Sequence, residues 1–178
     1  LGSALALRLF TEKLGKRADI VCDGFVLHPR YSFLKRSNKV GAKIGDLHQC
    51  MINVDIEKSG LSELSYDIKN TKKLRIFLTP KTGYINKEQI TISQTEYKYD
   101  LIITLDTPDL TALDGVYTHH EDFFYATPII NIDHKSSNEH YGTVNMIDMP
   151  ASTTSEIVYG LLTTFGEEHF TRHIANAL

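Results

Sequence analysis

Two apolar runs with a polar stretch between them most strongly limit how this chain can fold. Residues 99–105 and 128–132 are near-continuous apolar runs, the pattern of strands that are covered on both faces. The first run is followed by Asp106 and the second by Asp133. The segment 109–125 between them is suited to short helices, and a strand, a crossover and a strand form a parallel βαβ unit. The sequence therefore predicts an α/β fold with both aspartates at the carboxyl edge of the sheet.

Further elements extend this pattern on both sides. Apolar spacing predicts an N-terminal helix that ends at Gly15, a residue type favoured directly after helices. A mostly parallel sheet with helices on both faces is the expected architecture. The remaining expected elements are short strands over residues 18–22 and 143–147 and helices over residues 155–165 and 167–178.

The middle of the chain has a different character. Apolar and polar residues alternate or mix over residues 51–56, 64–68 and 74–78, with Lys, Ser, Gly and Asn between these runs. Residues 89–94 are suited to a further strand. The pattern predicts an antiparallel β-meander over residues 51–95, but it gives no indication of that segment's role.

Charge and composition exclude some classes of protein. The 178 residues carry a net charge of −3, so no broad basic face for duplex DNA is expected. No apolar run reaches the roughly 18–20 residues that span a bilayer. With two cysteines and no visible signal peptide, the chain is predicted to be cytoplasmic. It begins without an N-cap and ends on an apolar stretch, and we expect it to be an excerpt of a longer protein.

The aspartates and the residue after the second one indicate a metal site. On neighbouring parallel strands, Asp106 and Asp133 would lie about 5 Å apart, and such carboxylates repel unless a cation intervenes. His134 adds a nitrogen ligand suited to Mn²⁺, Fe²⁺ or Zn²⁺. The alternative is structural: Asp106 caps the following turn, while Asp133 and His134 make local hydrogen bonds. The residues alone leave both readings open.

Three other polar groups have simpler interpretations. His169 and His173 have the i, i+4 spacing of a zinc pair but are interpreted as surface or capping histidines. Residues 119–122 (His-His-Glu-Asp) are interpreted as a solvated loop. Residues 152–156 are typical of a helix N-terminus, with phosphate binding there as the alternative.

Several motifs resemble the DHH phosphoesterase superfamily, which includes RecJ-type exonucleases, oligoribonucleases, cyclic-di-AMP phosphodiesterases and manganese pyrophosphatases. Residues 1–7 resemble the helix after the family's first motif, and 101–107 resemble its second motif. The resemblance covers roughly residues 1–22 and 99–178 of a single domain, so residues 51–95 are interpreted as an insertion. The other matching residues are Asn131-Ile-Asp-His-Lys135, Asn138, Gly142, Asn145, Asp148, residues 151–159 and residues 173–178.

The resemblance implies a two-metal manganese site and a role for each residue. Asp106 would bridge two Mn²⁺ ions, His134 would ligate one of them, and Asp133 would orient the imidazole. Lys135 stands where the family has a second histidine and would contact the substrate phosphate as a point charge. Asn138 is assigned to substrate binding. The implied reaction is hydrolysis of phosphodiester bonds in short oligonucleotides or cyclic dinucleotides.

The resemblance also places metal motifs outside the printed chain, before Leu1 and beyond Leu178. We therefore expect the 178 residues alone to be inactive, and the full-length protein to carry the activity. A catalytically degenerate nucleotide-binding domain or a protein-interaction domain is the alternative, because Lys135 replaces a histidine. A homodimer is compatible with either interpretation.

Overall fold

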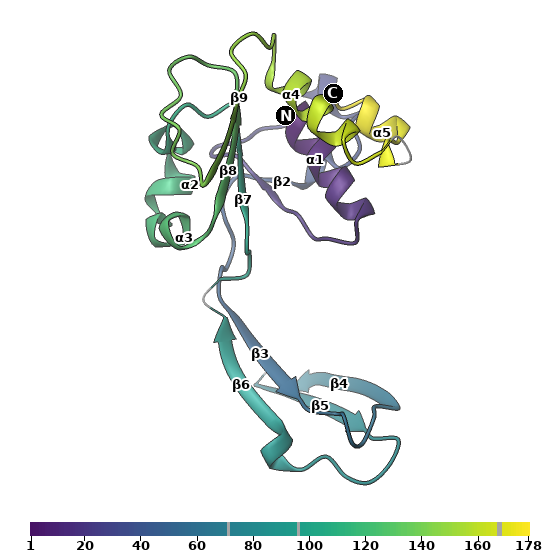
Figure 1. The fold of residues 1–178 in the computed structure, drawn as a ribbon. Helices are drawn as coiled ribbons and strands as arrows, with labels where there is room; N and C mark the ends of the chain where they lie inside the picture. Colours follow the sequence, from purple (N-terminus) through teal and green to yellow (C-terminus); the bar gives the residue numbers. More distant parts are fainter. Residues whose placement is uncertain (71, 96, 167–168) are drawn as a thin grey trace. The chain divides into compact units, whose positions relative to one another are not determined.

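The computed structural model describes residues 1–70, 72–95, 97–166 and 169–178. The chain divides into two compact units (Figure 1). Unit 1 comprises Leu1–Leu47 and Tyr99–Leu178, and unit 2 comprises His48–Lys98. Both predicted metal-site aspartates belong to unit 1.

The centre of unit 1 is a parallel sheet of three strands, β7 (Ile102–Leu105), β8 (Ile129–Asp133) and β9 (Val144–Ile147), in the order β7-β8-β9. Leu105 is paired with Ile132, so the residues that follow β7 and end β8 meet at one edge. The predicted parallel pairing of the two apolar runs is confirmed.

Helices cover both faces of this sheet, as Figure 1 shows, and the predicted fold class is confirmed. The crossover from β7 to β8 carries the helices of one face, while the helices of the other face come from the two ends of the chain. The first group is η4 (Leu110–Leu113), α2 (Gly115–Thr118) and α3 (Glu121–Ala126), and the second is α1 (Gly2–Lys13), α4 (Thr154–Thr163) and α5 (Arg172–Ala175).

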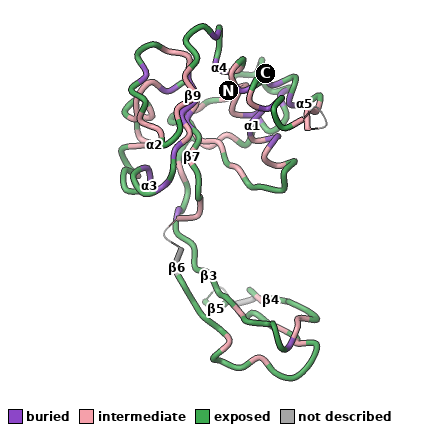
Figure 2. The backbone as a smooth tube through the Cα atoms, in the orientation of Figure 1, coloured by how far each residue is buried: buried purple, intermediate pink, exposed green. Residues whose placement is uncertain are grey.

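The core of unit 1 lies between the central strand and the terminal helices. Burial of these apolar side chains supplies the main favourable free energy for folding. Figure 2 shows the buried residues concentrated along the sheet and α1. The large apolar side chains that are almost fully buried are Leu5, Ile132, Val158, Leu162 and Ile174.

Local signals explain where the terminal helices end. Helix α1 stops at Lys13, and Gly15 follows with a φ of 71°, a conformation that glycine adopts without steric cost. The predicted helix over 167–178 is shorter, because Thr171 Oγ1 accepts a hydrogen bond from the Ile174 amide and caps a new helix there. Residues 167–168 lie outside the described residues.

Between α1 and unit 2 the chain is mostly irregular. It forms one parallel strand pair and two short 3₁₀ helices. These are β1 (Ile20–Val21) with β2 (Val40–Gly41), η1 (Pro29–Tyr31) and η2 (Ser37–Lys39).

Unit 2 consists of antiparallel strand pairs, but they do not form the predicted meander. Strand β3 (Gln49–Val54) pairs with β6 (Ile90–Thr95), and β4 (Glu63–Asn70) pairs with β5 (Lys73–Thr79). After β6 the chain returns to unit 1, and η3 (Lys87–Gln89) precedes β6.

The loop after β3 explains this pairing. The Ser62 amide donates to Thr79 O at 2.8 Å, and the Lys81 amide donates to Ser59 O at 3.1 Å. These hydrogen bonds hold the loop against the end of β5, and β3 pairs with β6. Strand pairing depends on such loop contacts, which the alternation within each strand does not encode.

One face of the β4–β5 ladder is apolar and exposed. Alternate residues of a strand point to the same face, and the partners in register with them are also apolar. Leu78, the partner of Leu64, is half-buried. Five large side chains of this face are each at least 43% exposed: Leu64, Tyr66, Ile68, Leu74 and Ile76. In the part of the chain that the structure describes, no helix has the length and apolar character needed to cross a membrane.

Candidate metal centre

Asp106 occupies the turn directly after β7. Its backbone has a φ of 57°, a left-handed conformation in which aspartate is enriched among non-glycine residues. The Asp106 amide donates to Ile132 O at 3.0 Å, which fixes this turn to the neighbouring strand. The carboxylate is 57% exposed and projects from the carboxyl edge of the sheet, where it is available to a ligand.

Asp133 is the last residue of β8 and is fully buried. Its Oδ1 accepts hydrogen bonds from the backbone amides of His134 (2.7 Å) and Lys135 (3.3 Å). Its Oδ2 accepts from Asn138 Nδ2 at 2.9 Å. These donors compensate the buried charge and leave the imidazole of His134 outside the set. Asp133 therefore holds the His134 peptide, rather than the ring as the family resemblance implied.

The imidazole of His134 faces the carboxylate of Asp106. Nε2 of His134 lies 3.6 Å from Oδ1 of Asp106, although they come from different strand ends. Ligand atoms of Asp106, Asp133 and His134 all lie within 4.8 Å of one another. It is the one such cluster of three or more potential ligands found among the described residues.

The donors of this cluster fit a divalent metal. A carboxylate oxygen and a neutral imidazole nitrogen are ligands of Mn²⁺, Fe²⁺ and Zn²⁺ in proteins. Asp106 and His134 reach solvent, whereas Asp133 is buried and already hydrogen-bonded. The first two are suited to direct ligation, and Asp133 is suited to supporting them from behind.

Lys135 reaches over the same carboxylate. Its Nζ donates to Asp106 Oδ1 at 2.6 Å and to the Asp106 carbonyl at 2.9 Å. The distance from Nζ to Asp133 Oδ1 is 4.0 Å. The ammonium thus lies where two negative side chains converge. The predicted residues Asp106, Asp133, His134 and Lys135 are all brought together.

Asn138 differs from its predicted role in substrate binding. The residue is buried, and Nδ2 donates to Asp133 Oδ2 and to Thr107 O. Its Oδ1 accepts hydrogen bonds from Asn131 Nδ2 at 2.7 Å and from the His140 amide at 2.9 Å. Because Nδ2 and Oδ1 of Asn138 both have protein partners, the side chain is poorly placed to contact a substrate directly. Asn138 instead ties the turn after β7 to Asp133.

A buried polar network behind the cluster was not predicted as part of the site. Asn131 is fully buried and donates to Asn138 and, at 3.1 Å, to Asn145 Oδ1. The Tyr141 hydroxyl donates to Thr104 Oγ1 at 2.7 Å. Burial raises the pKa of Tyr141. The available signal was Asn131 itself, since a polar residue within a buried apolar strand needs partners.

The other polar groups do not join the cluster. Nδ1 of His119 lies 2.7 Å from the Gly115 carbonyl, and the ring of His169 packs edge-on against Phe10. At the start of α4, Thr153 Oγ1 accepts from the Glu156 amide, and Glu156 Oε2 accepts from the Ser152 amide. This reciprocal capping favours the predicted N-cap over a phosphate site, because a carboxylate already occupies the helix start.

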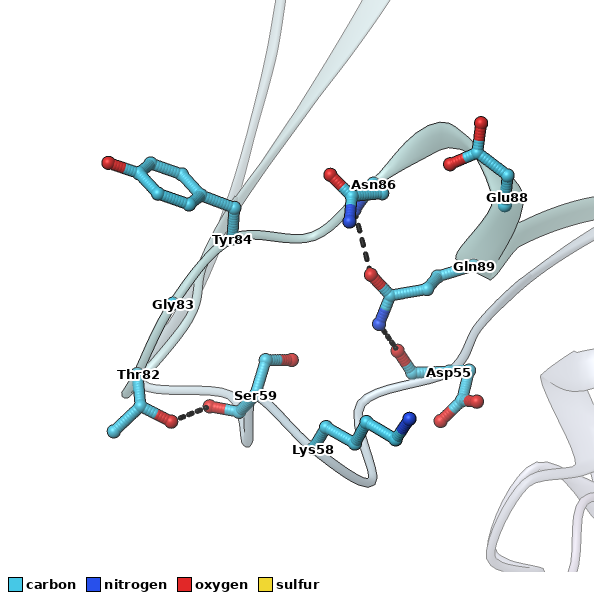
Figure 3. Close-up of a pocket in the computed structure, with 9 residues that line it drawn as sticks. All are labelled: Asp55, Lys58, Ser59, Thr82, Gly83, Tyr84, Asn86, Glu88 and Gln89. Atoms are coloured by element: carbon cyan, nitrogen blue, oxygen red, sulfur yellow. Dashed lines mark hydrogen bonds between the residues drawn. The ribbon is translucent and has the colours of Figure 1, made fainter.

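Unit 2 contains a separate cavity of about 560 Å³ (Figure 3). Three hydrogen bonds join residues of its lining. Gln89 connects the Asn86 amide to the Asp55 carbonyl, and the Thr82 hydroxyl donates to Ser59 O. These bonds stabilise the loops that join the two strand pairs. The buried Ser59 hydroxyl has no hydrogen-bond partner.

The chain is similar to a solved exopolyphosphatase-related protein from Bacteroides fragilis. The two structures superpose with a TM-score of 0.60 at 16% sequence identity, which indicates a shared fold. The similarity covers 99% of this chain but 39% of that protein. A search of curated proteins finds no match. The family model described as "DHH family, N-terminal domain" matches residues 1–178, and the chain therefore belongs to the DHH family.

Proposed function

We propose that this domain forms part of a metal-dependent phosphodiesterase that hydrolyses short oligonucleotides or cyclic dinucleotides with Mn²⁺. The observation that carries the proposal is the approach of His134 Nε2 to Asp106 Oδ1 at the carboxyl edge of the sheet. Ligands of α/β proteins bind at this edge. Membership of the DHH family and the exopolyphosphatase-related structural neighbour support phosphoester chemistry.

In this proposal Asp106 and His134 hold the metal. A bound divalent ion supplies Lewis-acid polarisation of a phosphoryl oxygen and lowers the pKa of bound water. Asp133 fixes the peptide that carries His134 and Lys135, through the two amides that donate to its Oδ1. Asn138 holds the other oxygen of Asp133 and the turn after β7, so the two strand ends keep their spacing.

Lys135 is the residue best placed to neutralise a phosphoryl oxygen. Its side chain is 38% exposed, and its ammonium has a third N–H beyond the two that it donates to Asp106. A lysine attracts phosphate as a point charge but lacks the two-nitrogen geometry of histidine. Substrate binding through Lys135 is therefore part of the proposal, while proton transfer is not assigned to it.

A nucleotide-binding protein without hydrolytic activity is the second candidate. The observation in its favour is the short contact between Lys135 and Asp106, because a carboxylate paired with an ammonium binds metal less readily. In this case affinity for nucleotides would persist without turnover.

The deciding experiment is Mn²⁺-dependent release of nucleoside monophosphate from a labelled dinucleotide by the full-length protein. A cyclic dinucleotide and polyphosphate are tested in parallel as substrates. Polyphosphate is included because the similar solved structure is an exopolyphosphatase-related protein. Asp106→Asn should abolish turnover and weaken Mn²⁺ binding by more than the roughly 10–100-fold typical of losing an outer-shell partner. The matched control is Asp100→Asn, an exposed aspartate just before β7.

Turnover that depends on Asp106 supports the phosphodiesterase. Nucleotide affinity without turnover on any of the three substrates supports the binding protein instead. Unchanged Mn²⁺ stoichiometry in Asp106→Asn contradicts the metal assignment in both.

A further inference from the structure

Lys135 is held in place by both strand ends. Its backbone amide donates to Asp133 Oδ1, so the peptide is fixed by a fully buried carboxylate. Its ammonium donates to the carboxylate and to the carbonyl of Asp106. Asp106 is in turn fixed by the hydrogen bond that its backbone amide donates to Ile132 O. The contact therefore joins two constrained segments, unlike a typical surface ion pair between mobile side chains.

The ammonium uses the oxygen that faces the imidazole. Oδ1 of Asp106 lies 2.6 Å from Lys135 Nζ and 3.6 Å from His134 Nε2. A carboxylate bridges two metal ions by offering lone pairs to both. A protonated lysine offers no lone pair and consumes one of those that Asp106 supplies. A neutral histidine at this position would leave those lone pairs to metal, whereas lysine adds a positive charge.

Charge leads to the same conclusion. Asp106 and Asp133 contribute two negative charges, and Lys135 is the positive side chain within 4.0 Å of both. An ammonium at that point offsets part of the repulsion that would otherwise recruit a cation. It also repels a second divalent ion at the same carboxylate.

We infer that the Lys135 ammonium replaces one of two metal ions, so that this centre holds a single divalent ion on Asp106 and His134. This inference rests on the proposed metal site and concerns its stoichiometry, not its turnover. Asp106 would hold the metal with the lone pairs that Lys135 does not use. The ammonium remains in place as a permanent monovalent charge beside it.

Mn²⁺ binding to the full-length protein tests this inference without any substrate. Equilibrium dialysis counts bound ions, and electron paramagnetic resonance separates an isolated Mn²⁺ from an exchange-coupled pair. The native protein should bind one ion per chain with the signal of isolated Mn²⁺. Lys135→His should bind two and show coupling, while Lys135→Arg, which keeps the charge, should remain at one. Circular dichroism checks that each variant is folded.

Other outcomes contradict the inference. Two coupled ions in the native protein would mean that metal displaces the lysine. One ion in both the native protein and Lys135→His would mean that another feature limits the stoichiometry. No binding in any variant would remove the metal site together with the inference. Because dialysis and resonance do not depend on hydrolysis, one bound ion without turnover supports the stoichiometry and counts against the phosphodiesterase alone.

Discussion

Asn138 donates a hydrogen bond of 2.9 Å to Oδ2 of Asp133, and both side chains are buried. This bond connects the supporting carboxylate of the cluster to the turn after β7, because Asn138 also donates to Thr107 O. The outward-facing residues of the cluster thus depend on an inward-facing amide.

Asn138→Ala should destabilise the domain by about 1–3 kcal/mol, since it leaves a buried carboxylate oxygen without its donor. Urea unfolding followed by circular dichroism measures the change. Ser137→Ala is the matched control: Ser137 is exposed on the same loop, and its replacement should change stability by no more than about 0.5 kcal/mol. Equal stability of the two variants would contradict a supporting role for Asn138.

Two glycines of unit 1 should respond to alanine in opposite directions. A Cβ at Gly142 would lie 2.7 Å from Val144 O and 2.9 Å from Asn131 Cβ, so the polar network must shift. Gly142→Ala should cost about 1–3 kcal/mol. At Gly160, in the middle of α4, a Cβ meets nothing within 4 Å, and Gly160→Ala should stabilise by about 0.5–1 kcal/mol. Thermal unfolding of both variants measures the two changes in stability. Destabilisation by both substitutions would contradict the open space described at Gly160.

The parallel part of the fold and the grouping of polar side chains at its edge were predictable because each depends on local sequence. The apolar runs that became β7 and β8 have the composition of doubly covered strands, and parallel pairing places the residues after them together. Asp106, Asp133, His134 and Lys135 follow directly from that geometry. Gly15 likewise marked the end of α1.

The features that the sequence did not predict, the strand pairing in unit 2 and the burial of Asn138, depend on contacts between segments distant in the sequence. Strand β3 pairs with β6, which is distant in the sequence, and the pattern within one strand does not encode its partner. Asn138 was predicted to bind substrate, and its sequence position does not show that it is buried and hydrogen-bonded to Thr107, Asn131 and His140. Burial is a tertiary property, so a single sequence does not specify it.

Removing unit 2 tests whether it is an insertion. Replacing His48–Lys98 by a short Gly-Ser linker should leave unit 1 folded, because its core is formed by segments outside that range. Such a linker is tolerated because loop-closure entropy changes slowly with length. Cooperative unfolding and unchanged Mn²⁺ affinity of the shortened full-length protein are expected. Loss of the cooperative transition would show that unit 2 is required for folding.

Tyr141 should make the stability of unit 1 sensitive to alkaline pH. Burial raises the pKa of its hydroxyl above the usual value, and the charge of Asp133 adds to the effect. The folded state therefore favours the protonated phenol. This contribution is fully present below the unfolded pKa of about 10, and it is lost as the pH rises through the higher folded pKa.

Tyr141→Phe isolates this contribution among the nine tyrosines of the chain. At pH 8 the variant should be less stable by about 1 kcal/mol, because the hydroxyl that lies within hydrogen-bond distance of Thr104 Oγ1 and Thr107 O is lost. Above pH 10 the difference should shrink, since only the native protein must keep a phenol protonated there. Urea unfolding of both proteins at pH 8, 9.5 and 10.5 measures it. A difference that stays constant or grows with pH would show that Tyr141 ionises at least as readily in the folded state as in the unfolded chain.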